Sequence, residues 1–193
     1  MTSIMQMTPD DELMRRIASG DALAFDTLVR RHLPKAFAVA RRILPSREDA
    51  EEAAQDAFNK IWVKAPLWQP EKARFTTWLY RVVVNAALDI ARKRTPRGVA
   101  QSEEMLAAIA DATPASDVQM VAHEEAVAVR EAVASLTAQQ RAAITLCYFE
   151  HHTNPQAAAV MGLHVKALEG LLVRARRALR EQLEKRKEAR HAA

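Results

Sequence analysis

An uninterrupted helical pattern of apolar residues between positions 50 and 62 constrains the fold of this chain most strongly. Alanines, followed by Phe58, Ile61 and Trp62, recur at intervals of three and four residues, and acidic residues occupy the opposite face. The rest of the chain agrees with this pattern, because it has only four glycines in 193 residues and is rich in residues that favour helices over strands. We find neither a strand pattern nor an internal repeat, and we predict an all-α fold.

Several classes of protein are excluded by what the sequence lacks. The single cysteine, Cys147, rules out an internal disulfide and fits a reducing compartment. No apolar run approaches the roughly 18–20 residues of a membrane span, and the first residues lack the basic and apolar parts of a secretory signal. We therefore expect a cytoplasmic protein without membrane insertion of its own.

The chemistry of catalytic and metal sites is equally sparse. Cys147, His151 and His152 are spaced i, i+4, i+5, but three possible ligands without a second pair nearby are weak support for a metal or redox site. A small buried hydrophobic role explains Cys147 better. With no phosphate-binding loop, nucleophile elbow or set of zinc ligands, we expect no enzyme, no cofactor and no metal.

Composition and helix signals divide the chain into two helical domains. We predict domains over residues 10–97 and 118–187, joined by a flexible acidic linker over 98–117. Residues 98–129 contain six acidic residues and no Lys or Arg. In the first domain, Asp21 and Ser46 are expected to cap helices, and Pro34 is expected to end one helix or begin the next.

The end of the first domain combines aromatic and basic residues. Residues 71–97 contain seven Lys or Arg and two acidic residues, and Phe75, Trp78 and Tyr80 precede the basic end of one long predicted helix. Rings that stack on bases and cations that follow phosphates suit single-stranded DNA. Ordinary packing of the same aromatic residues at the start of a helix is the alternative.

The second domain has the spacing of a helix-turn-helix between Thr153 and Arg177. Ala158 is small where two helices cross, and Gly162 stands where the turn needs a positive φ. The following helix would place its N-terminal part in a major groove. Residues 165–191 hold nine Lys or Arg and four Glu, which favours a phosphate backbone, although a solvated helix face is the simpler alternative.

Three stretches in order resemble the extracytoplasmic-function (ECF) sigma factors of bacterial RNA polymerase. The stretch from Asp49 to Phe58, continued by Ile61 and Trp62, is similar to the polymerase-docking helix of that family. The stretch 75–94 is similar to its promoter-melting and −10-reading helix, and 136–180 to its −35-binding domain. The resemblance implies an alternative sigma factor that binds core RNA polymerase, directs it to promoter DNA and assists melting. It also implies control by an anti-sigma factor.

The resemblance assigns three sets of residues. The polymerase-binding set is Asp49, Glu52, Gln55, Asp56, Phe58 and Trp62. The −10 set is Trp68, Phe75, Trp78, Arg81, Asn85, Arg92, Lys93 and Arg94, with Asp89 expected to pair locally. The −35 set is Lys166, Glu169, Arg174, Arg176 and Arg177.

The recognition helix departs from the family pattern at one place. Many members have Val-Lys-Ser-Arg where this chain has Leu168-Glu169-Gly170-Leu171. An acid and an apolar residue replace two cations, so the usual −35 contacts there are in doubt. Glu169 can accept a hydrogen bond from a cytosine amine, or it can face solvent.

Two other functions compete with a sigma factor. One is a free-standing helix-turn-helix regulator with an N-terminal helical sensor domain, and the other is a helical adaptor without DNA contact. The basic aromatic helix argues against the first, because a small-molecule sensor needs no such surface. The two basic segments argue against the second.

Overall fold

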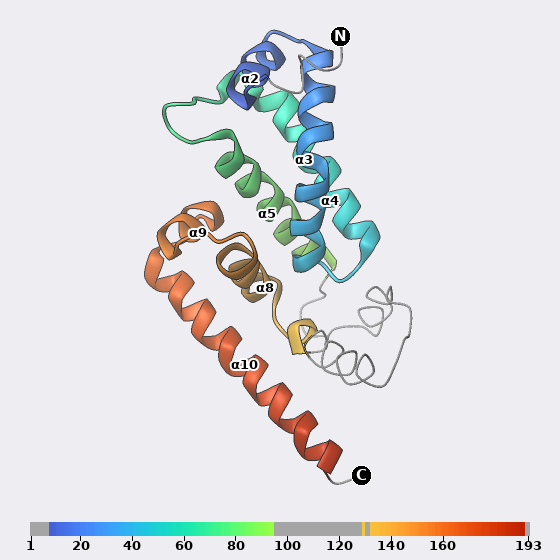
Figure 1. Cartoon of the computed structure of the whole chain (residues 1–193), viewed down its shortest axis with the longest axis vertical. Helices are drawn as coiled ribbons and strands as arrows, with labels where there is room; N and C mark the ends of the chain where they lie inside the picture. The colour runs from blue at the N-terminus through green and yellow to red at the C-terminus, as the bar shows by residue number, and fades with distance from the viewer. Residues whose placement is uncertain (1–7, 95–128, 130–131, 192–193) are drawn as a thin grey trace.

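Two groups of helices follow one another along the chain (Figure 1). The computed structural model describes residues 8–94, 129 and 132–191, and within these residues every regular element is a helix. The all-α prediction is confirmed for this part of the chain. The predicted linker at 98–117 and the predicted start of the second domain at 118 lie outside the described residues. The first group consists of α2 (Asp10–Ala18), α3 (Ala22–Ile43), α4 (Arg47–Lys64), the 3₁₀ turn η1 (Ala65–Leu67) and α5 (Phe75–Arg94).

The second group is smaller and carries a long terminal helix. Figure 1 shows α8 and α9 beside the first group, while α10 extends away from both toward the C-terminus. Its elements are α8 (Ala138–Ile144), the π-helical turn η2 (Thr145–Phe149), α9 (Asn154–Met161) and α10 (Val165–His191). Taken one at a time, the helices of the described residues are too short or too polar to cross a membrane. Only α9 and the first part of α10 together, bent by 101°, pass a test of length and composition.

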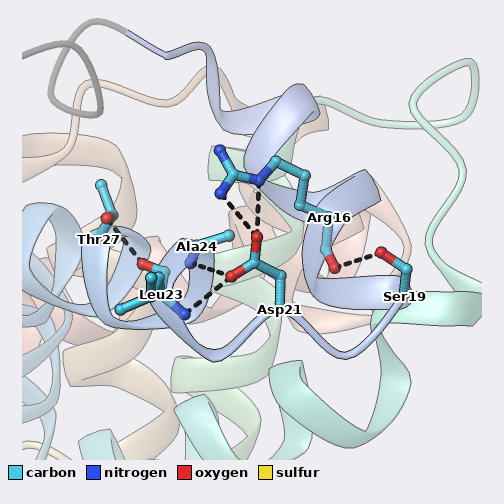
Figure 2. A network of polar contacts seen from close by, with 6 residues as sticks. All are labelled: Arg16, Ser19, Asp21, Leu23, Ala24 and Thr27. Atoms are coloured by element: carbon cyan, nitrogen blue, oxygen red, sulfur yellow. Dashed lines mark hydrogen bonds and ion pairs between the residues drawn. The ribbon is translucent and has the colours of Figure 1, made fainter. Parts of the chain in front are cut away.

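The turn between α2 and α3 is fixed by Asp21, as its sequence position predicted. One carboxylate oxygen of Asp21 accepts hydrogen bonds from the backbone N–H groups of Leu23 and Ala24, at 2.9 and 3.0 Å. The other accepts from the guanidinium of Arg16 at 2.6 and 2.8 Å (Figure 2). The bond from Ala24 and the bonds from Arg16 lower the pKa of this carboxyl group. The cap therefore joins the end of α2 to the start of α3.

Pro34 does not end a helix, contrary to the prediction. Helix α3 continues from Ala22 to Ile43 with Pro34 inside it. A proline within a helix removes a backbone hydrogen bond and costs about 3 kcal/mol. Pro34 lies exposed to solvent, whereas Leu28 and Val39 on either side of it are fully buried. Packing on both sides of the proline offsets the local cost, which sequence propensity alone did not reveal.

The core of the first group joins α2, α3, α4 and α5. Phe75 at the start of α5 is 1% exposed and lies against the ring of His32, with ring centroids 5.1 Å apart. Asp10 accepts hydrogen bonds from Arg31 at 2.6 Å and contacts the ring of His32 at 3.0 Å. This cluster joins α2 and α5 to α3.

Candidate polymerase- and DNA-binding surfaces

Helix α4 presents an acidic face to solvent. Glu52, Gln55 and Asp56 are exposed, and Glu51 extends the face toward the start of the helix. The alanine stripe on the opposite side is buried, and Ser46 caps the helix by accepting from the Asp49 N–H at 3.2 Å. The structure thus brings together the three polar members of the predicted polymerase-binding set that a partner could reach.

The other three members of that set are placed differently. Phe58 is buried at 4% exposure, while Trp62 keeps about a third of its surface exposed and packs edge-on against Phe25 at 5.0 Å. Asp49 is 5% exposed, and its carboxylate forms an ion pair with Arg94 at 2.6 Å. In this arrangement Asp49 anchors the end of α5 to the start of α4 and has almost no surface that a partner could reach.

Helix α5 presents some of the predicted −10 residues on its solvent side. Arg81 and Asn85 are exposed one turn apart, and Trp78 is half-buried. Phe75 has almost no surface available to a base, and its edge contact with Trp78 at 6.3 Å makes it a support for that ring. Packing, the alternative reading of the aromatic residues, therefore describes Phe75 in this structure.

The basic end of α5 is exposed but already engaged in ion pairs. Arg92 pairs with Asp89 as the sequence predicted, and Arg94 pairs with Asp49 and Glu52 of α4. Lys93 is exposed. Each of these ion pairs places opposite charges side by side. Opposite charges also meet in an open groove between α4 and α5. The groove is lined by Asp56, Lys60, Ala86, Asp89, Ile90, Arg92 and Lys93.

Trp68 lies in the connection between η1 and α5. Its ring is half-buried against the core, and its indole N–H is buried without a hydrogen-bond partner among the described residues. Trp68 therefore presents part of its ring to solvent from the loop that precedes α5.

The helix-turn-helix forms between α9 and α10 as the sequence predicted. Thr153 and Gln156 make a reciprocal capping box at the start of α9. Gly162 ends it with φ of 66°, and the Leu163 N–H donates to the Ala158 carbonyl at 2.9 Å. This is a helix end that glycine provides without strain. Ala158 is 1% exposed, as expected for a small residue packed within this domain.

The predicted −35 residues lie along one end of α10, exposed to solvent. They are Lys166, Glu169, Arg174, Arg176 and Arg177. Arg177 pairs with Glu181 at 2.8 Å, and the guanidinium of Arg174 lies over Gly170, where a Cβ would come within 3.3 Å of it. Leu171 is 8% exposed. The departure from the family pattern at this residue therefore adds a core contact.

Sequence reasoning missed a polar cluster between the two helix groups. Glu150, just after η2, contacts Lys35 and Arg42 of α3 and Tyr80 of α5. Burial would raise the pKa of Glu150, but hydrogen bonds from Lys35 and Tyr80 and the charges of Lys35 and Arg42 outweigh it and lower that pKa. Burial and the bond to Glu150 raise the pKa of Tyr80. No sequence pattern marks these residues, because they lie 70 or more positions from Glu150.

Cys147 forms no part of a metal site in the described structure. It is half-buried in η2, and burial raises the pKa of its thiol. The described residues contain no group of three or more His, Cys, Asp or Glu side chains that could hold a metal ion.

An acidic helix face, a basic aromatic helix and a helix-turn-helix in one chain define a DNA-binding protein that also has a surface for a protein partner. Comparison with known families is more specific. Residues 28–97 match Sigma-70 region 2, and residues 126–179 match Sigma-70 region 4.

Individual relatives agree with these matches. The RNA polymerase sigma factor CnrH of Cupriavidus metallidurans is 32% identical over 179 residues, which cover 88% of this chain and 93% of the relative. The ECF RNA polymerase sigma factor SigM of Mycobacterium tuberculosis is 32% identical over 167 residues, 86% of this chain and 81% of the relative. The chain belongs to the ECF sigma factors of bacterial RNA polymerase.

Two solved structures show the same arrangement of helices. CnrH in complex with the cytosolic domain of CnrY has a TM-score of 0.63 and 29% identity, with coverage of 91% of this chain and 97% of that one. RpoE in complex with the anti-sigma factor NepR, from Bartonella quintana, has a TM-score of 0.60 and 25% identity, with coverage of 83% and 96%. As a member of this family, the chain is a non-enzymatic subunit that directs RNA polymerase to promoters. Family membership therefore excludes the two alternative functions, the free-standing regulator and the adaptor.

Proposed function

We propose that the acidic face of α4 is the main docking surface for core RNA polymerase. Glu52, Gln55 and Asp56 form an exposed polar strip, and the exposed edge of Trp62 adds apolar area at its end. Charged strips accelerate encounter, while a partly exposed aromatic residue supplies contact area. Asp49 supports this face through its ion pair with Arg94.

The solvent side of α5 then reads the −10 element as its strands separate. Asn85 can donate to and accept from a base edge, and Arg81 can bind a phosphate. Trp78 offers a half-exposed ring, and the Trp68 loop contributes to a pocket for an extruded base, an event that costs a few kcal/mol. Arg92, Lys93 and Arg94 hold the backbone nearby.

One observation carries this proposal. The acidic face of α4 and the basic aromatic face of α5 belong to two helices packed against each other, with oppositely charged residues lining the groove between them. One rigid unit can therefore hold polymerase beside the DNA strand that must be opened.

The recognition helix α10 reads the −35 element from its N-terminal half. Lys166, Glu169 and Arg174 are exposed there, and Arg176 and Arg177 continue the basic surface. Arginines on an exposed helix attract the phosphate backbone, while Glu169 is the residue that can discriminate a cytosine.

We also propose that an anti-sigma factor restrains this chain in the cytoplasm. CnrH was solved with the cytosolic domain of CnrY, and RpoE with the anti-sigma factor NepR. Both solved relatives share the helical arrangement of this chain, and its docking faces are exposed. Isolation of the tagged chain from uninduced cells should yield one stoichiometric protein other than polymerase. Polymerase alone under all conditions would indicate control by expression level.

Run-off transcription with purified core polymerase tests the surfaces separately. Asp56→Arg should abolish binding to core, whereas Asn85→Ala and Trp68→Ala should leave core binding intact and impair open-complex formation. Asp26→Asn, which removes an exposed ion pair with Arg30 on α3, is the matched control and should behave as wild type. Normal open complexes with both Asn85→Ala and Trp68→Ala would contradict the −10 assignment.

A further inference from the structure

One buried carboxylate joins the two helix groups. The side chain of Glu150 is 1% exposed, and one of its oxygens accepts from Lys35 Nζ and Tyr80 Oη, each at 2.6 Å. The other oxygen accepts from Arg42 Nη1 at 3.1 Å. Lys35 and Arg42 are seven residues apart, two turns along the same face of α3. Two cations and a hydroxyl from the N-terminal helices therefore surround one acid from the C-terminal helices.

A second polar contact lies nearby on α8. Arg141 is 7% exposed, and its Nε donates to the carbonyl of Ile43, the last residue of α3, at 2.6 Å. A cation at a helix C-terminus is favourable, because the last carbonyl groups lack partners within the helix. Burial lowers the pKa of Arg141 to about 10. This contact fixes α8 to the end of α3.

Aromatic side chains surround the Glu150 contact. The Arg42 guanidinium lies 4.7 Å from the centre of the Phe149 ring, and the rings of Tyr80 and His152 meet edge to face at 4.8 Å. Each of these pairs joins one helix group to the other. These polar and ring contacts lie beside apolar ones, because the buried side chains of the two groups form one cluster.

The backbone that presents Glu150 is unusual. The π-helical turn η2 precedes it, and His151 directly after it has φ of 55°. A left-handed conformation costs a non-glycine residue energy, and such strain persists only where surrounding contacts hold it. The Glu150 N–H donates to the Thr145 carbonyl at 3.0 Å, which closes the π turn. The strained turn directs the acid toward α3 and α5.

This closed arrangement is incompatible with reading both promoter elements at once. Elements centred near −35 and −10 lie about 25 base pairs, or about 85 Å, apart along B-DNA. In the closed chain, α9 of the helix-turn-helix contacts α5, and α10 is only about 40 Å long at 1.5 Å per residue. This step rests on the proposed assignment of α5 and α10 to the two elements.

We propose that Glu150 and its acceptor site, formed by Lys35, Arg42 and Tyr80, are a reversible lock that holds the free chain closed. The lock opens when the helix groups separate onto polymerase and promoter. Opening returns the side chains of the Glu150 contact to water, and it also separates apolar side chains, because the buried residues of the two groups form one cluster. The occupant of the acceptor site is thus a segment of this chain.

The lock can be tested without polymerase or DNA. Fluorescent labels at Lys64→Cys and Gln182→Cys, both exposed sites, report the separation of α4 and α10 in a Cys147→Ala background of the full chain. Glu150→Ala should increase the ratio of open to closed chains roughly tenfold or more, because it strands partners of a buried ion pair. Glu181→Ala, which removes an exposed ion pair within α10, should change nothing.

A charge exchange separates loss of the lock from misfolding. Glu150→Lys should open the chain, and adding Lys35→Glu and Arg42→Glu should close it again, while circular dichroism shows unchanged helix content. Equal distances in wild type and Glu150→Ala would overturn the lock, as would an open wild-type chain.

Transcription then distinguishes the two proposals. If Glu150→Ala opens the chain and binds core polymerase more tightly, both proposals hold. If Glu150→Ala opens the chain but neither the wild type nor this variant reads promoters through α5 and α10, the promoter assignment fails while the lock stands.

Discussion

The two helix groups achieve stability by different means. The N-terminal group buries large side chains, among them Phe75, Leu28 and Ile61, in a core shared by four helices. The described part of the C-terminal group buries mainly alanines and leucines, and its aromatic residues Tyr148 and Phe149 remain half-exposed. Small cores supply little stability, so caps and turns matter more there. The N-terminal group is a packed unit, while the C-terminal group depends more on its local geometry.

The largest expected effect tests the packed unit. Phe75→Ala should lower the free energy of unfolding of the N-terminal group by about 3–5 kcal/mol, because it removes a fully buried ring. Denaturant unfolding followed by circular dichroism measures this loss. Tyr148→Ala in the C-terminal group is the matched control, and its half-exposed ring predicts a much smaller loss. Equal losses would contradict the comparison.

The turn of the helix-turn-helix tests the dependence on local geometry. Gly162→Ala should destabilise the C-terminal group by about 1–2 kcal/mol, because φ is positive there. An added Cβ meets nothing within 4 Å, so this cost comes from the backbone conformation alone. Gly170→Ala should instead stabilise α10 by about 0.5–1 kcal/mol, since it replaces glycine within a helix and the Arg174 guanidinium, 3.3 Å from the added Cβ, is the flexible end of a side chain that can move aside. Thermal unfolding of both variants measures the contrast. Loss of stability in both would show that packing, rather than backbone conformation, limits this region.

Charged residues on α10 test the account of −35 binding. Arg176→Ala should weaken binding to all −35 sequences alike and reduce the salt slope by about 0.9, as expected for one lost phosphate contact. Glu169→Ala should alter preference at one base pair, by about 1–3 kcal/mol if the carboxylate accepts from cytosine. Titrations on a panel of −35 variants at several salt concentrations separate the two. A change in preference from Arg176→Ala alone would reverse the roles.

The smallest expected effect is the pH dependence of the contact between the two groups. Burial of Glu150 and attraction by its partners oppose each other, and the net result is a pKa below its ordinary value of 4.5. The contribution of the carboxylate to closure is therefore fully present above pH 4.5 and is lost as pH falls through the lowered pKa. Lys35, Arg42 and Tyr80 face this carboxylate, and His152 packs against the Tyr80 ring.

Fluorescence transfer across an acid titration measures this opening. Glu150→Gln has no carboxylate to titrate, so its distance should vary less with pH than that of wild type. Identical acid curves would assign the opening to other groups, such as Asp10 with its lowered pKa.

Local patterns in the sequence determined the helices, their caps and the turn of the DNA reader. Asp21, Ser46 and Gly162 act where the sequence placed them, because capping and positive φ involve residues only a few positions apart. The stripe opposite the acidic face of α4 was equally visible, since helical spacing fixes which side chains share a face. These features depend on short-range physics, which a sequence displays directly.

Only the tertiary structure decided which of these residues are available and how the two groups meet. It buried Asp49 and Phe75, kept α3 continuous through Pro34, and brought Glu150 against Lys35, more than a hundred positions away. Burial and long-range ion pairs arise from packing several helices at once, and no periodicity along one helix encodes its partner. The faces of each helix were therefore predictable, but their neighbours were not.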